Sequence, residues 1–157
     1  MKGLAILLLA AVTPPAARET VGVYRGWAAF RDPDRCYAIA APVKAGRARR
    51  RQPFASVGTW PGRGLRSSLH VRLSRAHDRS AAVTLSVGER RFTLVAGRVD
   101  AWARDAASDR AIVAAMRAAR SMSVETVAVG GRSFADTYAL AGAATAIDAA
   151  LLACVGR

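Results

Sequence analysis

The sequence predicts a mainly β fold in which short antiparallel strands form a sandwich or barrel, with a short helix at about 108–119 and a C-terminal helix at about 141–154. Two observations carry this prediction. Between residues 24 and 103, short apolar runs, several of which alternate with period two, are separated by turn residues, a pattern typical of strands with one buried face. Helical periodicity enters only in the second half, where apolar residues recur at steps of three and four.

The alternation of side chains supports the strands individually. In residues 69–73 the apolar side chains alternate with His70 and Arg72, so the two kinds face opposite sides of a sheet. Gly88-Glu89 joins two runs as a hairpin, and Gly130-Gly131 turns a later strand pair. The predicted strands span residues 24–30, 36–41, 54–60, 69–74, 82–87, 91–96, 99–103, 121–129 and 133–138.

Caps and apolar stripes predict the two helices. Ser108 and Asp109 can cap a helix over residues 110–119. In the terminal helix, Cys154 shares a face with the apolar residues, so its thiol is expected to point at the core. The first stripe is Ile112, Val113 and Met116, and the second is Leu140, Ala144, Ile147, Leu151 and Cys154.

Composition predicts one domain, residues 18–157, with a thin core. Of the 157 residues 36 are alanine, and Leu, Ile, Val and Phe together number only 35. This large-apolar content is just above the level at which a highly charged chain is expected to be disordered. A chain of this length is expected to form one core, which excludes a two-domain enzyme with a cofactor domain of its own.

Residues 1–17 have the layout of a secretory signal. Lys2 is followed by an apolar run over residues 4–12 and then by small residues and prolines over 13–17. The run is too short to span a bilayer. We expect cleavage after Ala17 and a soluble mature chain without a transmembrane segment, located in the periplasm, associated with the outer membrane, or secreted. The alternative is a buried N-terminal strand or helix.

Two cysteines, Cys36 and Cys154, remain in the expected mature chain, and an exported pair with no other thiol most simply forms a disulfide. A metal site would have to use His70 and His77, but none of the four residues has the short spacing of zinc ligands. A catalytic thiol would need a base and an activating environment, and the sequence indicates neither.

The sequence contains no recognisable catalytic or cofactor motif, such as a Gly-x-Ser-x-Gly elbow, a His-Glu-x-x-His pair, a P-loop or a dinucleotide fingerprint. We therefore expect no cofactor, no metal and no enzymatic activity. The alternative is a small hydrolase that uses His70 or His77 as a base; His70 is expected to face solvent on a strand and His77 to lie in a polar turn. The three tryptophans, expected in the core, are Trp27, Trp60 and Trp102.

Positive charge is concentrated in one half of the chain. The net charge is +13, and residues 20–91 alone contribute +11. No acidic residue lies between Arg35 and His77. The candidate anion-binding residues are Lys44, Arg47, Arg49, Arg50, Arg51, Arg63 and Arg66. Arginine pairs well with phosphate and carboxylate groups, so lipopolysaccharide, acidic lipid headgroups or an acidic protein are the candidate partners. Nucleic acid is unlikely for an exported chain, and a solvated loop is the alternative.

Three C-terminal segments are distinctive and include Asp136-Thr137-Tyr138 and Gly142 before a helix that ends in cysteine; they are residues 116–124, 130–142 and 146–154. These segments resemble the invasion-associated locus B (IalB) family of exported bacterial proteins. Trp27 and Cys36, followed by Pro42, are similar to the opening of that family. Ala119 stands where the family's turn usually has glycine.

The resemblance implies an immunoglobulin-like β-sandwich, a periplasmic or surface location and, in some pathogens, a link to host-cell invasion. It carries over no catalytic residue. Together these observations predict a non-enzymatic exported protein that binds an anionic envelope or host component through a basic loop, Lys44 to Arg51, or a purely structural envelope protein without ligand. We expect Asp136 or Thr137 to bond nearby backbone, Tyr138 to bury its ring with its hydroxyl at the rim, and Gly142 to let the helix approach the sheet.

Overall fold

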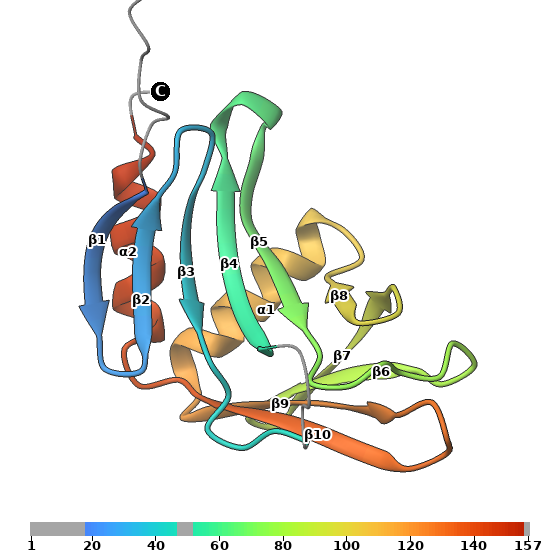
Figure 1. Cartoon of the computed structure of the whole chain (residues 1–157). Coiled ribbons are helices and arrows are strands. Elements are labelled where there is room, and N and C mark those ends of the chain that lie inside the picture. The colour runs from blue at the N-terminus through green and yellow to red at the C-terminus, as the bar shows by residue number, and fades with distance from the viewer. Residues whose placement is uncertain (1–17, 47–51, 156–157) are drawn as a thin grey trace, which may run out of the picture.

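Ten strands form one continuous antiparallel sheet in the computed structural model, which describes residues 18–46 and 52–155 (Figure 1). The strand order is β1-β2-β3-β4-β5-β8-β7-β6-β9-β10. The strands are β1 (Glu19–Tyr24), β2 (Trp27–Arg31), β3 (Cys36–Ala40), β4 (Phe54–Trp60), β5 (Leu65–Arg72), β6 (Val83–Val87), β7 (Arg90–Ala96), β8 (Asp100–Trp102), β9 (Ser121–Val127) and β10 (Ser133–Ala139). The expected signal segment, residues 1–17, lies outside the described residues.

The sheet bends into two leaves. Strands β1 to β5 form an upright first leaf, and β6, β9 and β10 run across its lower end (Figure 1). Two helices, α1 (Ala106–Ala118) and α2 (Ala143–Ala153), complete the fold, and a short 3₁₀ turn, η1 (Pro61–Arg63), joins β4 to β5. The predicted architecture, mainly β, antiparallel and sandwich-like with one short and one C-terminal helix, is therefore confirmed.

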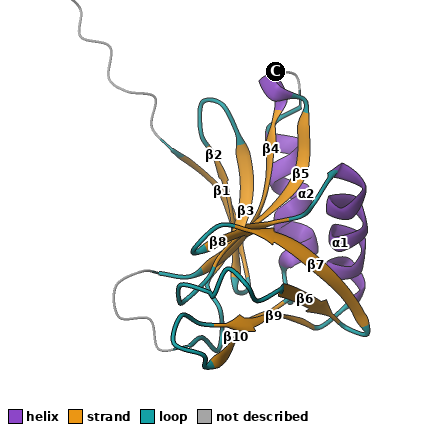
Figure 2. Ribbon diagram, turned by 90° about the vertical axis from the view of Figure 1, so that its right-hand side faces the viewer, coloured by secondary structure: helices purple, strands orange, loops and turns teal. Residues whose placement is uncertain are grey.

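Both helices cover the same side of the first leaf, which we call the inner face (Figure 2). Along most of β2 to β5, alternate residues point to this face and are almost fully buried, among them Trp27, Ala29, Cys36, Ala38, Ala55, Val57, Leu69 and Val71. Many of these residues are alanine, and the buried side of α2 is also mainly alanine, so sheet and helix can approach each other closely. The buried residues of α2 are Ala143, Ala146, Ile147 and Ala150. In the predicted stripe, Ile147 and Cys154 are buried, whereas Ala144 and Leu151 lie at its edge.

The N-terminal strand prediction was wrong in one respect, because residues 24–30 do not form one strand. The chain turns at Arg25 and Gly26, and β1 and β2 pair as an antiparallel hairpin. Arg25 adopts a left-handed backbone conformation with φ of 57°. A turn at Arg25 and Gly26 therefore interrupts the predicted strand. Neither the presence of Gly26 nor the alternation of apolar residues had led us to expect it. The β6–β7 hairpin at Gly88 and the glycine turn before β10 are as predicted.

The first helix begins at Ala106, two residues before the predicted range 108–119 and four before residue 110, where the cap prediction placed its start. Asp105 is its N-cap, and its side chain accepts a hydrogen bond of 2.7 Å from the backbone N–H of Ser108. Asp109, expected to be a cap, instead lies buried against β5, where it accepts a hydrogen bond of 2.7 Å from Leu69 N–H. The prediction failed because three closely spaced polar residues offer alternative caps.

The second helix starts at a close contact with the first hairpin. Gly142 has φ of 89°, and a Cβ at this position would lie only 1.9 Å from the carbonyl oxygen of Tyr24. Only glycine fits there, as expected from the sequence. No helix within residues 18–46 and 52–155 is both long enough and apolar enough to cross a bilayer.

Buried polar side chains where the two leaves meet form most of their hydrogen bonds with backbone groups. Asp136 is fully buried and accepts hydrogen bonds from Ser74 N–H at 2.8 Å and Gly46 N–H at 3.2 Å. The prediction of a structural role is right, but the partners are distant in sequence rather than local. Trp27 donates its indole N–H to Ala139 O at 2.9 Å. The hydroxyl of Tyr138 was expected at the rim, yet it is buried and has no hydrogen-bond partner among the described residues.

Candidate functional site

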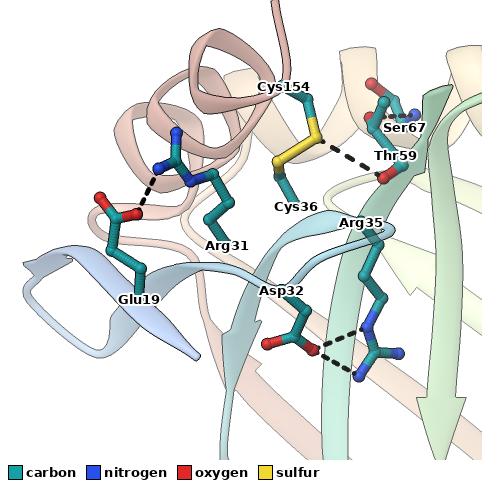
Figure 3. The surroundings of a disulfide bond; sticks show 8 residues. All are labelled: Glu19, Arg31, Asp32, Arg35, Cys36, Thr59, Ser67 and Cys154. Carbon is teal, nitrogen blue, oxygen red and sulfur yellow. Dashed lines mark hydrogen bonds and ion pairs between the residues drawn. A yellow bond between two sulfur atoms is a disulfide. The ribbon is translucent and has the colours of Figure 1, made fainter. Parts of the chain in front are cut away.

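The predicted disulfide is present between Cys36, the first residue of β3, and Cys154, which follows α2 (Figure 3). The two Cα atoms are 5.9 Å apart, and the residues are separated by 118 positions. Both cysteines are buried, and Cys154 Sγ lies 3.9 Å from Thr59 O on β4. The bond therefore fixes the end of the terminal helix to the inner face. Within the described residues no group of three His, Cys, Asp or Glu side chains is placed to hold a metal ion.

The three predicted anion-binding residues that the structure describes, Lys44, Arg63 and Arg66, do not gather at one place. Lys44 lies beyond β3 and forms an isolated β-bridge with Thr137 of β10. Arg63 and Arg66 lie at the other end of β4, about 20 Å away for a strand of this length. Their surroundings also differ, because Arg63 borders a depression shared with Asp34, whereas Arg66 borders one beside Cys154. Arg47, Arg49, Arg50 and Arg51 lie outside the described residues.

The two histidines depart from their predicted surroundings. His77, expected in a polar turn, is only 4% exposed, and its backbone and ring nitrogens both lie within hydrogen-bonding distance of Arg98 O. His70, expected to face solvent, is half-buried. Its Nε2 lies 2.9 Å from Asp100 Oδ1. No hydrogen bond from a hydroxyl or thiol group reaches either ring within the described chain, so nothing in the arrangement supports the hydrolase alternative.

The side of the first leaf opposite the helices (Figure 2) is what we call the outer face. Aromatic and arginine side chains lie on it, as the strand register places them. It is formed by the alternate residues that do not reach the inner core, and β8 extends it beyond β5. Its aromatic residues are Phe30, Tyr37, Phe54, Trp60, His70 and Trp102. The ring of Trp60 folds back over Gly58, where a Cβ would come within 2.7 Å of the indole. No helix of the described residues lies on this side. The exposure of the rings ranges from 41% for Trp102 to 7% for Tyr37.

One end of the outer face holds what we call the Arg18 cluster, formed by Arg18, Phe30, Asp32, Arg35 and Tyr37. Both arginines bond to Asp32, Arg18 at 3.1 Å and Arg35 at 3.0 Å. The guanidinium of Arg18 lies 5.6 Å from the Phe30 ring and 5.7 Å from the Tyr37 ring, while that of Arg35 lies 4.7 Å from Tyr37. Two positive charges therefore share one carboxylate on an aromatic base.

The two arginines of the Arg18 cluster shift the pKa of its carboxyl group, that of Asp32. Partial burial of Asp32 opposes ionisation, but hydrogen bonds from Arg18 and Arg35 outweigh it and hold the pKa of Asp32 below its usual value. Asp32 is thus ionised at neutral pH, and the cluster has a net positive charge.

The other end holds what we call the Trp102 cluster, formed by Phe54, His70, Arg72, Asp100 and Trp102. The His70 and Trp102 rings stack, with centroids 5.4 Å apart and planes 9° apart. Phe54 meets His70 edge-on at 5.1 Å, and the Arg72 guanidinium lies 5.1 Å from the Phe54 ring. Asp100 Oδ1 is 2.9 Å from His70 Nε2 and accepts a hydrogen bond of 3.1 Å from Arg72 Nε.

The carboxylate of the Trp102 cluster is also stabilised in its charged form. Partial burial acts against ionisation, yet the contacts from His70 and Arg72 lower the pKa of Asp100.

Trp102 is 41% exposed, so the prediction that it belongs to the core was wrong. Trp60 is half-buried on the outer face, and of the three tryptophans only Trp27 is in the core.

A depression of about 350 Å³ adjoins the Trp102 cluster at Phe54. Its lining is mainly apolar and includes Ala28 and Ile39 of the outer face, and Arg25 is the charged residue that borders it. Sequence reasoning missed both this depression and the Trp102 cluster. The one available signal was the alternation in residues 69–73, which correctly placed His70 and Arg72 on the same side of β5.

No family model, curated protein or solved structure matches this chain in the comparisons made. The resemblance to the IalB family stays a prediction that depends on the residues quoted above.

Proposed function

We propose that this protein is an exported, non-enzymatic binding module that contacts an anionic component of the cell envelope. The observation that carries the proposal is the Arg18 cluster, in which Arg18 and Arg35 share the single carboxylate of Asp32 on an open face. Arginine on an aromatic base keeps N–H groups in a fixed orientation, which suits paired hydrogen bonds to phosphate or carboxylate.

The location is supported by two independent features. The chain has a buried disulfide, and such bonds persist in oxidising compartments such as the bacterial periplasm. Residues 1–17 have the order of basic, apolar and small residues typical of an export signal. In that location the available anions are lipopolysaccharide phosphates, acidic lipid headgroups and acidic proteins.

The charge distribution supports the same partner class. Residues 20–91 contribute +11 of the net +13, and the described part of this segment includes Arg35 and Lys44. An uneven field of this kind attracts polyanions and is screened by salt. We therefore expect the binding to weaken as ionic strength rises.

The test is co-sedimentation of the purified oxidised protein with lipopolysaccharide and with vesicles of anionic or zwitterionic phospholipid, at low and at high salt. We expect salt-dependent binding to the anionic particles only. The double variant Arg18→Gln and Arg35→Gln should bind at least about threefold more weakly, because two charge-assisted contacts are lost.

A second variant, Arg49→Ser with Arg50→Ser and Arg51→Ser, tests the predicted basic loop. The matched control is Arg104→Gln with Arg110→Gln, which removes two exposed charges next to or within α1, on the helix side of the molecule. Equal losses in the control and in the Arg18 double variant would mean that net charge alone drives the binding. Salt-independent binding, or none, would refute the proposal.

A further inference from the structure

The Trp102 cluster differs from the Arg18 cluster in its charge balance. Arg72 is the one permanent cation of the Trp102 cluster, and the ionised Asp100 neutralises it. A polyanion would gain little there and would meet a carboxylate. The cluster is therefore suited to an uncharged polar ligand.

The polar groups of the Trp102 cluster keep hydrogen-bonding capacity toward solvent. Asp100 Oδ1 takes both internal contacts, and Asp100 Oδ2 has no partner among the described residues. Arg72 uses Nε, and its two terminal nitrogens have no hydrogen bond within the described part of the chain, so they can donate to a ligand. Acceptors and donors thus stand beside the indole of Trp102, which is 41% exposed although His70 stacks on one of its faces. A ligand would pack on the face of the indole that His70 leaves free.

This combination matches the chemistry of a sugar ring. A sugar presents an apolar C–H face, which packs against a flat aromatic ring, and hydroxyl groups at its edge, which both donate and accept hydrogen bonds. Planar groups such as those of Asp100 and Arg72 can each take two hydroxyl contacts. A nucleic acid strand would also stack on the rings, but its phosphates would have to approach Asp100 without an excess of positive charge.

The shape of the outer face indicates a chain rather than a single ring. From Trp102 on β8, the surface runs through His70 and Phe54 to the depression at Ile39 and Ala28 on β3 and β2. The five adjacent strands β8, β5, β4, β3 and β2 extend over about 19 Å at the usual strand spacing. This span is longer than one sugar ring.

We propose that the outer face binds an oligosaccharide segment, with one sugar ring packed on Trp102, its hydroxyls bonded to Asp100 and Arg72, and the chain continuing past Phe54 into the depression. This inference goes beyond the proposed function, because the contacts it names are with uncharged sugar groups and do not depend on the arginines of the Arg18 cluster. Salt should therefore leave saccharide binding nearly unchanged.

The test is a titration of the oxidised protein at high salt, followed by tryptophan fluorescence and by calorimetry. The probes are the neutral β-1,4-linked tetramer of N-acetylglucosamine, the deacylated oligosaccharide of lipopolysaccharide, and a ten-nucleotide oligothymidylate. We expect at least one saccharide to bind and the oligothymidylate not to bind. Trp102→Ala should weaken saccharide binding about tenfold, which corresponds to ~1.4 kcal/mol.

Two further variants separate the contact from folding effects. Trp102→Phe keeps an aromatic face and should stay within about threefold of the wild type in affinity, and Asp100→Asn should lose affinity because it changes an acceptor into a donor. The matched control is Leu152→Ala, a 70% exposed apolar residue on α2. Binding of neither saccharide by the wild type, equal binding by Trp102→Ala, or binding of oligothymidylate alone would overturn the proposal. Loss of anion binding in the Arg18 double variant with saccharide binding intact would support both sites separately.

Discussion

The two faces of the first leaf differ sharply in composition although the same strands supply both. The inner face is built from small residues such as Ala29, Ala38 and Ala55, which are fully buried beneath the helices. The outer face carries the large aromatic and charged side chains, including Trp102, which is 41% exposed. Most folds place their largest rings inside. Here Trp102 is exposed and Phe54 and Trp60 are half-buried on the outer face, while alanines supply much of the packing on the inner face.

The difference between the two faces explains how a core with few large apolar residues can stabilise the fold. Alanine buries little apolar area, so each contact contributes little. It also loses no side-chain entropy on folding and allows sheet and helix to approach closely. The large buried side chains of Trp27 and Tyr138 contribute the apolar area that alanine lacks, and the disulfide adds a covalent crosslink. The inner face should therefore be sensitive to added volume and to loss of the crosslink, and the outer face to neither.

The largest expected effect comes from removing the crosslink of the inner face. In the chain-entropy model, a bond that closes a loop of 118 positions stabilises the folded state by about 5 kcal/mol. Cys36→Ser with Cys154→Ser should lower the free energy of unfolding by about that amount, as measured by urea denaturation. The reduced wild type serves as control and should show a similar loss; a loss below about 1 kcal/mol in both would contradict the model.

An intermediate effect distinguishes two adjacent alanines of β2. Ala29 is fully buried on the inner face, and Ala29→Leu should cost about 3 kcal/mol, because added methylenes cannot be accommodated beneath α2. Ala28 borders the depression on the outer face, so Ala28→Leu should change stability by less than about 0.5 kcal/mol. Both are measured by urea denaturation. Equal costs for the two variants would show that the faces are packed alike.

The smallest effects come from two carboxyl groups on opposite sides of β5. Burial raises the pKa of Asp109 despite its bond from Leu69 N–H, whereas Asp100 has its pKa lowered by His70 and Arg72 in spite of partial burial. Asp109→Asn keeps an acceptor and should stabilise the protein by about 1 kcal/mol at pH 7. Asp100→Asn should destabilise it by less than about 1 kcal/mol, because the pair is partly exposed.

The pH dependence gives these two effects a checkable sign. The unfolded pKa of both groups is about 3.9. The penalty at Asp109 grows as pH rises through its raised folded pKa, so the advantage of Asp109→Asn should disappear below about pH 4. The stability from Asp100 is complete above about pH 4 and is lost as pH falls through its lowered pKa, so the deficit of Asp100→Asn should also shrink there. Urea denaturation between pH 3 and 7 measures both effects. A further variant, Asp109→Ala, leaves Leu69 N–H unsatisfied and should lower the free energy of unfolding by about 2 kcal/mol.

Local patterns predicted the fold well, because strands, hairpins and the disulfide depend on alternation, turn residues and cysteine count. They predicted the outer face poorly. Phe54, His70 and Trp102 come from three strands that are not all consecutive, and they meet only because the three-residue strand β8 pairs with β5. Likewise, the carboxyl of Asp109 could be read as a helix cap, since nothing local indicates that Leu69 N–H lies opposite it. In both cases, contacts between segments that are distant in the sequence determine where the side chains lie.

The disulfide between Cys36 and Cys154 also closes most of the chain into a covalent ring that contains every element from β3 to α2. A protease that cuts one loop of this ring opens it but releases no fragment, so both pieces stay linked until a reductant is added. Strands β1 and β2 lie before Cys36, and a cut between them would release the peptide that carries Arg18 and β1 from the rest of the chain. In a compartment rich in proteases, most of the outer face is thus protected from loss by a single cut, whereas the Arg18 cluster is not.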